Sequence, residues 1–356
     1  MNFQRRAGPP GAAIGALFAL ALAASPLGAK PRSGLLSTQF LGKPSGARFI
    51  GLGETGAALP GVPQSPMYNP ANLGDLPATF LALDFDVASQ SDLPKDVVLR
   101  ASALRGRKLT YIGFAASAKA VFYRPLADFD ETVVTVLTDP QNNFVQDSLR
   151  VEQFGLSASQ KTEKGYAVGL GISYLSARRG FARAGTGLPP VLELASGNGF
   201  ALDWGFRDEQ GPFIYGLSIL NLPGVIYWDR YRTDQLPVLG RAGVAFRPLS
   251  GVLFLTDYEK RFYQGNQPNP SLWHFGLEIL PLPWLALRSG ALSEDFNDRN
   301  KTVYSWGLSL ATPQNHVLDL ALRAEHLQDR KVFRYGLSMN FPLPESGEKT
   351  QGGSGK

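Results

Sequence analysis

The chain has 356 residues, of which 44% are hydrophobic and 18% are charged, and its formal net charge is +5. It contains no cysteine, which excludes disulfide scaffolds, cysteine-ligated metal clusters and cysteine nucleophiles. Three scattered histidines argue against a histidine metal site, and the lack of a lysine- and arginine-rich run argues against nucleic-acid binding. The 39 glycines and 26 prolines are too many for a helical bundle.

The first residues are typical of an export signal. Arg5 and Arg6 precede an uncharged, mostly apolar run at residues 11–24, which is followed by small residues and Pro26. A basic start, a short apolar run and alanine-rich cleavage options mark a secretory signal peptide. The run is too short for a membrane anchor, which needs about 20 apolar residues. We therefore predict a signal peptide over residues 1–29.

From about residue 78 onward, apolar residues recur with a period of two, which indicates β-strands. In residues 166–174, even positions carry large apolar side chains and odd positions carry Ala, Gly or Ser. Two structures satisfy such alternation. A soluble sheet would place the large side chains in its core, and a membrane barrel would place them toward lipid.

The connections between strands favour the barrel. About fourteen runs are predicted as strands, at residues 78–89, 96–105, 109–122, 147–160, 165–175, 199–207, 212–221, 237–247, 251–260, 270–280, 284–292, 302–311, 316–327 and 331–341. Short turns mostly alternate with longer loops, notably at 123–146 and 176–198, and the short connector at 328–330 is the one exception. This alternation of short and long connections is typical of an outer-membrane barrel and not of a Greek-key sandwich. We therefore predict an all-β fold, a transmembrane antiparallel up-and-down β-barrel of about 14 strands, rather than a secreted soluble β-protein.

A glycine motif precedes the strands. Gly51, Gly53 and Gly56 match the spacing of a dinucleotide-binding motif, in which a helix starts at the glycines. Pro60 and Pro63 would end such a helix almost at once, and no βαβ unit surrounds the motif. We interpret these glycines as part of a tight coil or plug segment, and we expect no cofactor.

Strand periodicity also places charged residues on the face opposite the large apolar side chains, which is the lumen side of a barrel. These residues are Arg241, Arg247, Asp257, Glu259, Glu278, Arg288, Asp319 and Arg323. Opposite charges on neighbouring strands can pair, so we favour a network that holds a plug over a selectivity lining for a solute. His274 shares this face, and we interpret it as a hydrogen-bonded lumen residue. We expect no catalytic residue and no metal site.

Two N-terminal stretches carry a family resemblance. Residues 46–58 read Gly-Ala-Arg-Phe-Ile-Gly-Leu-Gly-Glu-Thr-Gly-Ala-Ala, and Asn69-Pro70-Ala71 follows shortly before the first predicted strand. This arrangement resembles the plug region of the FadL/PorV-type outer-membrane barrels, the outer membrane protein transport superfamily. The runs at 239–248, 257–260 and 275–278 are similar to the C-terminal half of that family.

The resemblance implies a 14-stranded barrel with an N-terminal plug. The expected divisions are a signal peptide at 1–29, a plug or hatch segment at 30–77, a transmembrane barrel at 78–343 and a polar tail at 344–356. Pro70 fixes its own φ angle and Asn69 can cap a local turn, so Asn69-Pro70-Ala71 is expected to fix the plug to the wall.

Family functions include uptake of hydrophobic compounds and, in the PorV branch, a shuttle role in protein secretion. We therefore expect a non-enzymatic protein of the bacterial outer membrane that binds or transports hydrophobic small molecules. The alternative is a PorV-like barrel that docks a secreted or periplasmic protein, or a structural outer-membrane protein. The expected partners are outer-membrane lipid, a hydrophobic solute or such a protein, and no nucleic acid.

Overall fold

A computed structural model describes residues 46–89, 107–135, 143–163, 165–185, 188–263, 269–327 and 330–344. The predicted signal peptide, the first part of the predicted plug and nearly all of the predicted tail lie outside these ranges. None of the described ranges contains a helix long and apolar enough to cross a membrane.

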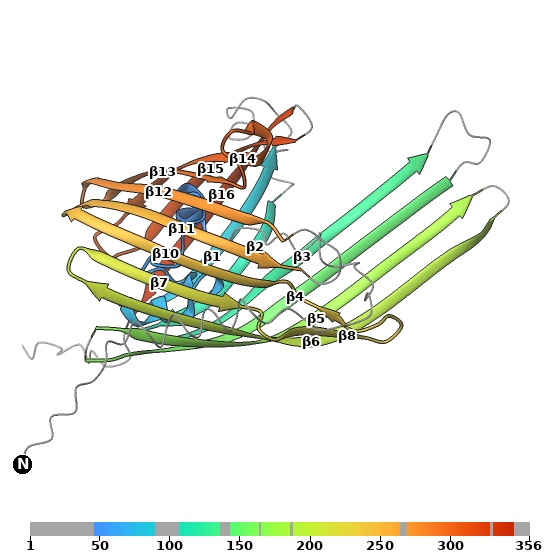
Figure 1. Ribbon diagram of the computed structural model, residues 1–356, viewed down its shortest axis with the longest axis horizontal. Helices are drawn as coiled ribbons and strands as arrows, with labels where there is room; N and C mark the ends of the chain where they lie inside the picture. The colour runs from blue at the N-terminus through green and yellow to red at the C-terminus, as the bar shows by residue number, and fades with distance from the viewer. Residues whose placement is uncertain are drawn as a thin grey trace, which may run out of the picture.

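Fourteen antiparallel strands form one closed barrel, which confirms the predicted fold (Figure 1). They are β1 Thr79–Ser89, β2 Arg107–Ala116, β3 Lys119–Thr135, β4 Asn143–Lys161, β5 Ala167–Gly185, β6 Leu188–Gln210, β7 Phe213–Leu220, β10 Val238–Leu249, β11 Val252–Phe262, β12 Ser271–Leu282, β13 Leu285–Ser293, β14 Thr302–Ala311, β15 Val317–Leu327 and β16 Arg330–Leu343. β1 closes the barrel on β16, with Thr79 opposite Leu343 and Ser89 opposite Phe333. Two short strands, β8 Gly224–Trp228 and β9 Asp234–Gln235, form a side ribbon on β6.

One predicted strand was wrong because it contains a turn. The run at 109–122 is two strands, β2 and β3, which a tight turn joins at Ser117 and Ala118. Ala118 takes a positive φ of 66°, a conformation that non-glycine residues adopt in turns. The predicted strand at 96–105 lies outside the described residues, so the count of fourteen agrees although the ranges differ.

Two predicted loops were also wrong, because most of their residues belong to strands. The residues at 123–146 and 176–198 largely extend β3–β4 and β5–β6, which reach 17, 19, 19 and 23 residues. A spanning strand needs only about 9–11 residues. In Figure 1 these four strands project well beyond the rest of the wall. The projecting parts of these strands lie beyond the apolar band, so neither of their faces has to be apolar. Their sequence therefore lacks the alternation by which the other strands were predicted.

The outer surface is apolar and the inner surface is small or polar. On β5, the outward Leu170 and Ile172 keep 53% and 54% of their surface exposed, whereas the inward Ala167 and Ser173 are buried. The other outward-facing strand positions repeat this pattern with exposed Phe, Trp, Tyr and Leu side chains. A soluble sheet shows the reverse order, and a band of this size is stable only against lipid.

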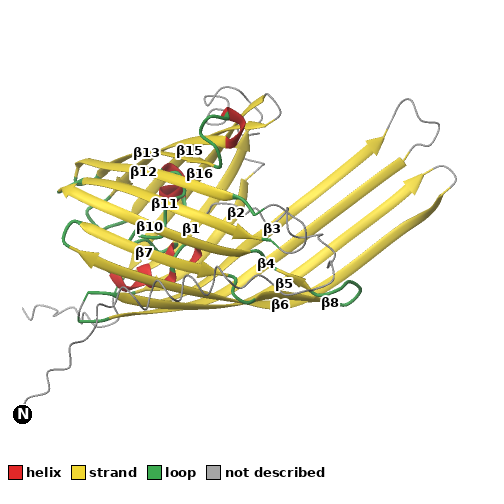
Figure 2. Cartoon of the chain, viewed as in Figure 1, coloured by secondary structure: helices red, strands yellow, loops and turns green. Residues whose placement is uncertain are grey.

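Residues 46–77, here called the inner segment, lie inside the barrel (Figure 2). The segment contains helix α2 Ala47–Gly51 and two short 3-10 helices, η1 Ser65–Met67 and η2 Pro70–Asp75. α2 contacts β13 to β16, and η2 contacts β3 to β6. Its apolar side chains form the main core of the molecule with inward residues of the wall. That core contains Phe49, Leu52, Ala58, Leu59, Val62, Met67, Tyr68, Ala82, Tyr111, Phe122, Ile214, Ala245, Leu253 and Leu255.

The wall is not uniform between β2 and β3. Within the described residues, their ladder runs only from Ala116 opposite Lys119 to Ile112 opposite Tyr123. β3 then continues on β4 alone, and its Pro125 has no N–H to donate to a neighbour on the other side. In Figure 1 the two strands point away from each other beyond this hairpin.

Candidate functional site

The interior of the barrel is the candidate site, and its centre is a carboxylate that holds the inner segment. Asp257 on β11 is buried, and its Oδ2 accepts hydrogen bonds from the backbone N–H groups of Gly56 at 2.6 Å and Ala57 at 2.9 Å. Hydrogen bonds to a charged acceptor are stronger than neutral ones. The predicted motif glycine Gly56 therefore binds the wall through its backbone.

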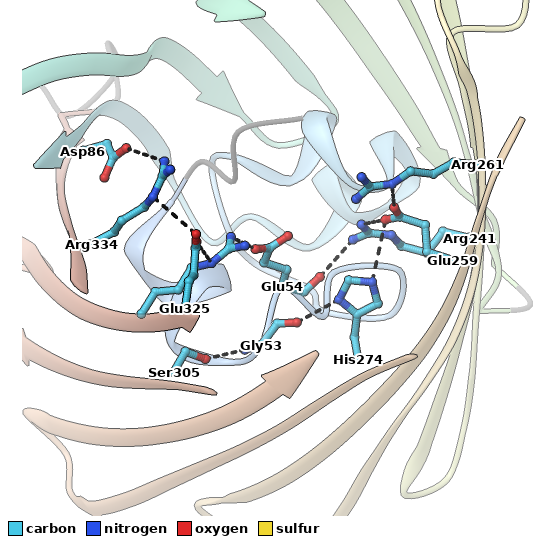
Figure 3. Close-up of polar contacts among 11 residues, drawn as sticks. Gly53, Glu54, Asp86, Arg241, Glu259, Arg261, His274, Ser305, Glu325 and Arg334 are labelled. Carbon is cyan, nitrogen blue, oxygen red and sulfur yellow. Dashed lines mark hydrogen bonds and ion pairs between the residues drawn. The ribbon is translucent and has the colours of Figure 1, made fainter. Parts of the chain in front are cut away.

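A second group surrounds Glu259 on β11 (Figure 3). The Glu259 carboxylate pairs with Arg241 of β10 and lies 2.5 Å from Nε of Arg261. Arg241 also donates a 2.9 Å hydrogen bond to the carbonyl oxygen of Glu54. His274 of β12 bonds through Nδ1 to the carbonyl oxygen of Gly53 at 2.8 Å. Arg241 and His274 of the wall thus hold the turn that contains Gly53 and Glu54.

A third group continues from the Glu54 side chain toward β16 and β1 (Figure 3). Glu54 pairs with Arg323, and Nε of Arg323 lies 2.5 Å from Glu325. Arg334 then bridges Glu325 at 3.6 Å and Asp86 at 4.0 Å. The chain of alternating charges connects the inner segment to both strands that close the barrel.

A fourth group forms around Arg48 of helix α2. Nε and Nη2 of Arg48 donate to the Glu278 carboxylate at 2.9 and 2.7 Å. Arg288 donates to Glu278 at 2.6 Å and to Asp319 at 2.9 Å, and Ser309 also bonds to Asp319. Two positive and two negative groups therefore balance in this network, which we call the Arg48 network.

The Asn69-Pro70-Ala71 corner lies against β4 and β6. The Asn69 side chain donates to the carbonyl oxygens of Ala57 at 2.6 Å and Phe206 at 3.0 Å, and it accepts from the Ala71 N–H at 3.0 Å. Pro70 occupies the first position of η2, where a missing N–H has no cost. Ser159 of β4 donates to the carbonyl oxygen of Ala71 at 3.1 Å.

Two wall glycines make room for the inner segment. A Cβ atom at Gly216 would lie 1.9 Å from the carbonyl oxygen of Ala57, and one at Gly290 would lie 2.0 Å from the backbone nitrogen of Gly53. Real Cβ atoms do not approach backbone so closely, so larger residues cannot occupy these positions without moving the segment. The inward glycines thus set the depth at which the inner segment packs.

Of the eight charged residues that were predicted to face the lumen, seven lie in these groups and one is exposed. Seven of them, Arg241, Asp257, Glu259, Glu278, Arg288, Asp319 and Arg323, join the groups described above. Arg247 is exposed at the end of β10 and joins none of these groups.

Several charged residues of the inner segment were not among the predicted site residues. Arg48 and Glu54 each pair with a wall residue more than 200 positions away. Asp75 pairs with Arg207 of β6 and, at 2.8 Å, with Lys161 of β4. The period-two pattern covers the wall only, so it carried no signal for these residues. Among the described residues, no group of three His, Cys, Asp or Glu side chains is placed to hold a metal ion.

Comparison of the sequence with known proteins gives no match, either to a family model or to a curated protein. Comparison of the fold with solved structures does give matches. The toluene transporter TbuX of Ralstonia pickettii aligns with a TM-score of 0.60 at 14% identity, over 84% of this chain and 98% of that chain. The toluene transporter TodX of P. putida gives 0.58 at 10% identity, over 83% and 97%. A FadL homologue of Pseudomonas aeruginosa gives 0.57 at 11% identity, over 85% and 99%.

At these identities the likeness concerns the fold, and it extends over nearly the whole length of each relative. Two of these three are named as transporters and none as an enzyme. The chain therefore has the closed 14-stranded fold of the FadL-type outer-membrane barrels.

Proposed function

We propose that this protein resides in the bacterial outer membrane, after export on the signal peptide at 1–29, and transports hydrophobic small molecules. The observation that carries the proposal is the fold, which is shared with two toluene transporters over more than four fifths of this chain. The apolar outer band supports the location, because it requires lipid contact.

In this proposal the inner segment is the plug. It fills the lumen with an apolar core and with paired charges, so a solute passes when part of the segment rearranges. Its contacts differ around the wall. Toward β4, β6 and β10 to β16 the inner segment lies against ion pairs, whereas its contacts with β2 and the β2–β3 turn include neutral hydrogen bonds. Tyr111 donates to the Pro63 carbonyl oxygen at 3.1 Å, and the Ala118 N–H donates to the Leu73 carbonyl oxygen at 3.2 Å.

The side with neutral contacts is also the side where the β2–β3 ladder ends early. A hydrophobic molecule that leaves the lumen between β2 and β3 enters the hydrocarbon region directly, without crossing the polar rim. Transfer of an apolar molecule into an apolar phase is favourable. We therefore propose that the solute leaves sideways through this part of the wall.

Uptake by intact Gram-negative cells tests the function, since their outer membrane slows the passage of toluene. Cells that express the full chain should take up labelled toluene faster than cells with an empty vector. Uptake of a polar molecule of similar size should not change. Equal gain for both molecules would indicate an aqueous pore, and no gain for toluene would contradict the proposal.

A second candidate function, docking of a protein partner, is supported by one observation. The projecting part of β3 to β6 provides a surface outside the apolar band, and Leu192 and Leu194 on it keep 72% and 63% of their surface exposed. Removal of residues 180–194 with a two-residue turn in their place should abolish copurification of a secreted or periplasmic partner. If no partner copurifies with the full chain, the result contradicts docking. A fall in toluene uptake after the deletion would then link the projecting strands to transport.

A further inference from the structure

A cavity of roughly 210 Å³ lies between the inner segment and strands β12 to β16, apart from the anchoring groups at Asp257 and Glu259. It opens at the end of the barrel where β1 begins and β16 ends, because Phe80 of β1 and Val317 of β15 both line it. Trp284, in the turn between β12 and β13, stands at its mouth with 51% of its surface exposed.

Two small side chains of the wall leave room for the cavity. The inward positions 286 of β13 and 311 of β14 both carry alanine. On the opposite side the inner segment turns at Gly61, with φ at 72°, before Val62 and Pro63. The wall and the inner segment therefore stay apart here, while they touch at Gly216 and Gly290.

The lining is mostly apolar and contains two aromatic side chains, the buried Phe80 and the half-exposed Trp284. Its floor is the Arg48 network, in which Glu278 and Asp319 accept hydrogen bonds from Arg48 and Arg288. The Arg48 side chain keeps 24% of its surface exposed, whereas Glu278, Arg288 and Asp319 keep 3–5%. Because the two positive and two negative charges already pair, a charged ligand would find no uncompensated partner. A neutral ring gains more, since guanidinium groups attract the face of an aromatic ring.

The volume restricts the ligand further. An apolar cavity of about 150 Å³ holds benzene, so this cavity accommodates one ring with a small substituent and is too small for a long acyl chain. We propose that it binds a neutral, single-ring aromatic molecule. This inference rests on the proposed function for its ligand class, and it gives the solute a binding site on the side of the barrel opposite β2 and β3.

Fluorine NMR tests the site on the full chain in lipid nanodiscs, with every tryptophan replaced by 5-fluorotryptophan. The Trp284 resonance is assigned by its loss in Trp284→Phe. Added toluene should shift this resonance in a saturable manner, and benzoate should not. The variant Ala311→Phe fills the cavity and should lose the shift. Leu310→Phe, one residue along β14 and facing outward, should keep it.

A Trp284 resonance that does not respond to toluene would overturn the proposal, as would an equal shift in Ala311→Phe, which would report partition into lipid. The milder Ala286→Leu gives the same comparison if Ala311→Phe fails to form a heat-modifiable barrel. Toluene uptake by cells separates the two proposals. Uptake without a saturable shift removes this site and keeps the transport function, and a saturable shift without uptake keeps the site and removes the transport function.

Discussion

Asn69 is the residue whose side chain makes most of the contacts at the corner of the inner segment. It is fully buried, and its amide joins the segment to itself at Ala57 and Ala71 and to the wall at Phe206. We expect Asn69→Ala to leave buried backbone groups without partners, at about 1–3 kcal/mol for each. Hydrogen exchange in residues 46–77 should accelerate, while exchange in the wall strands stays slow. Asn300→Ala, in the exposed 3-10 helix η4 Arg299–Lys301, is the matched control and should change neither. Unchanged exchange in Asn69→Ala would contradict this role.

A second prediction for single residues concerns the wall glycines. Gly216→Ala places a methyl group against the Ala57 carbonyl oxygen, and overpacking of this kind costs about 1–3 kcal/mol. The inner segment should be displaced, so we expect faster hydrogen exchange of the segment and a changed rate of toluene uptake. Gly240→Ala on β10 serves as control, because the nearest atom to its Cβ would be 3.8 Å away. Equal behaviour of the two variants would show that the close approach at Gly216 has no effect.

At the scale of elements, the early end of the ladder between β2 and β3 can be tested with disulfides. The chain has no cysteine of its own, so a pair of introduced cysteines can react only with each other. Phe114 and Val121 are opposite each other in the ladder, and paired strand positions lie about 4.5–5.5 Å apart, within disulfide range. Cysteines at these two positions should therefore form a disulfide under mild oxidation. If the same register continued, Tyr111 would be opposite Arg124 and Thr110 opposite Pro125, but the ladder has ended there. Cysteines at 110 and 125 should stay reduced, and an equally fast disulfide there would show that the wall is closed.

The same elements show what the sequence could predict. The strands with strict alternation, such as β5 from Ala167 to Tyr174, were predicted because one face meets lipid and the other the lumen. The extensions of β3 to β6 were not, because outside the apolar band nothing forces the two faces to differ. The turn at Ala118 was missed because the alternation continues on both sides of it.

At the scale of the whole molecule, periodicity assigned charged residues to the inner face but could not supply their partners. Glu54 and Arg323 are 269 positions apart, and they meet because the inner segment lies inside the barrel beside β15. The glycine motif at 51–56 drew attention to the inner segment, yet its role depends on which wall atoms it touches. Those contacts depend on the curvature of the complete barrel, which no local pattern in the sequence records.

In the proposed function, hydrophobic molecules pass through this barrel and leave between β2 and β3. The most direct test is toluene uptake by cells that carry Thr110→Cys with Pro125→Cys, before and after treatment with a reducible bis-maleimide. A strain with Phe114→Cys and Val121→Cys, two positions that are already paired in the β2–β3 ladder, controls for the reagent. We predict that the cross-link at 110 and 125 lowers uptake to the level of the empty vector, that reduction restores it, and that the control pair shows no change. Uptake that continues unchanged through the cross-linked barrel would contradict the account.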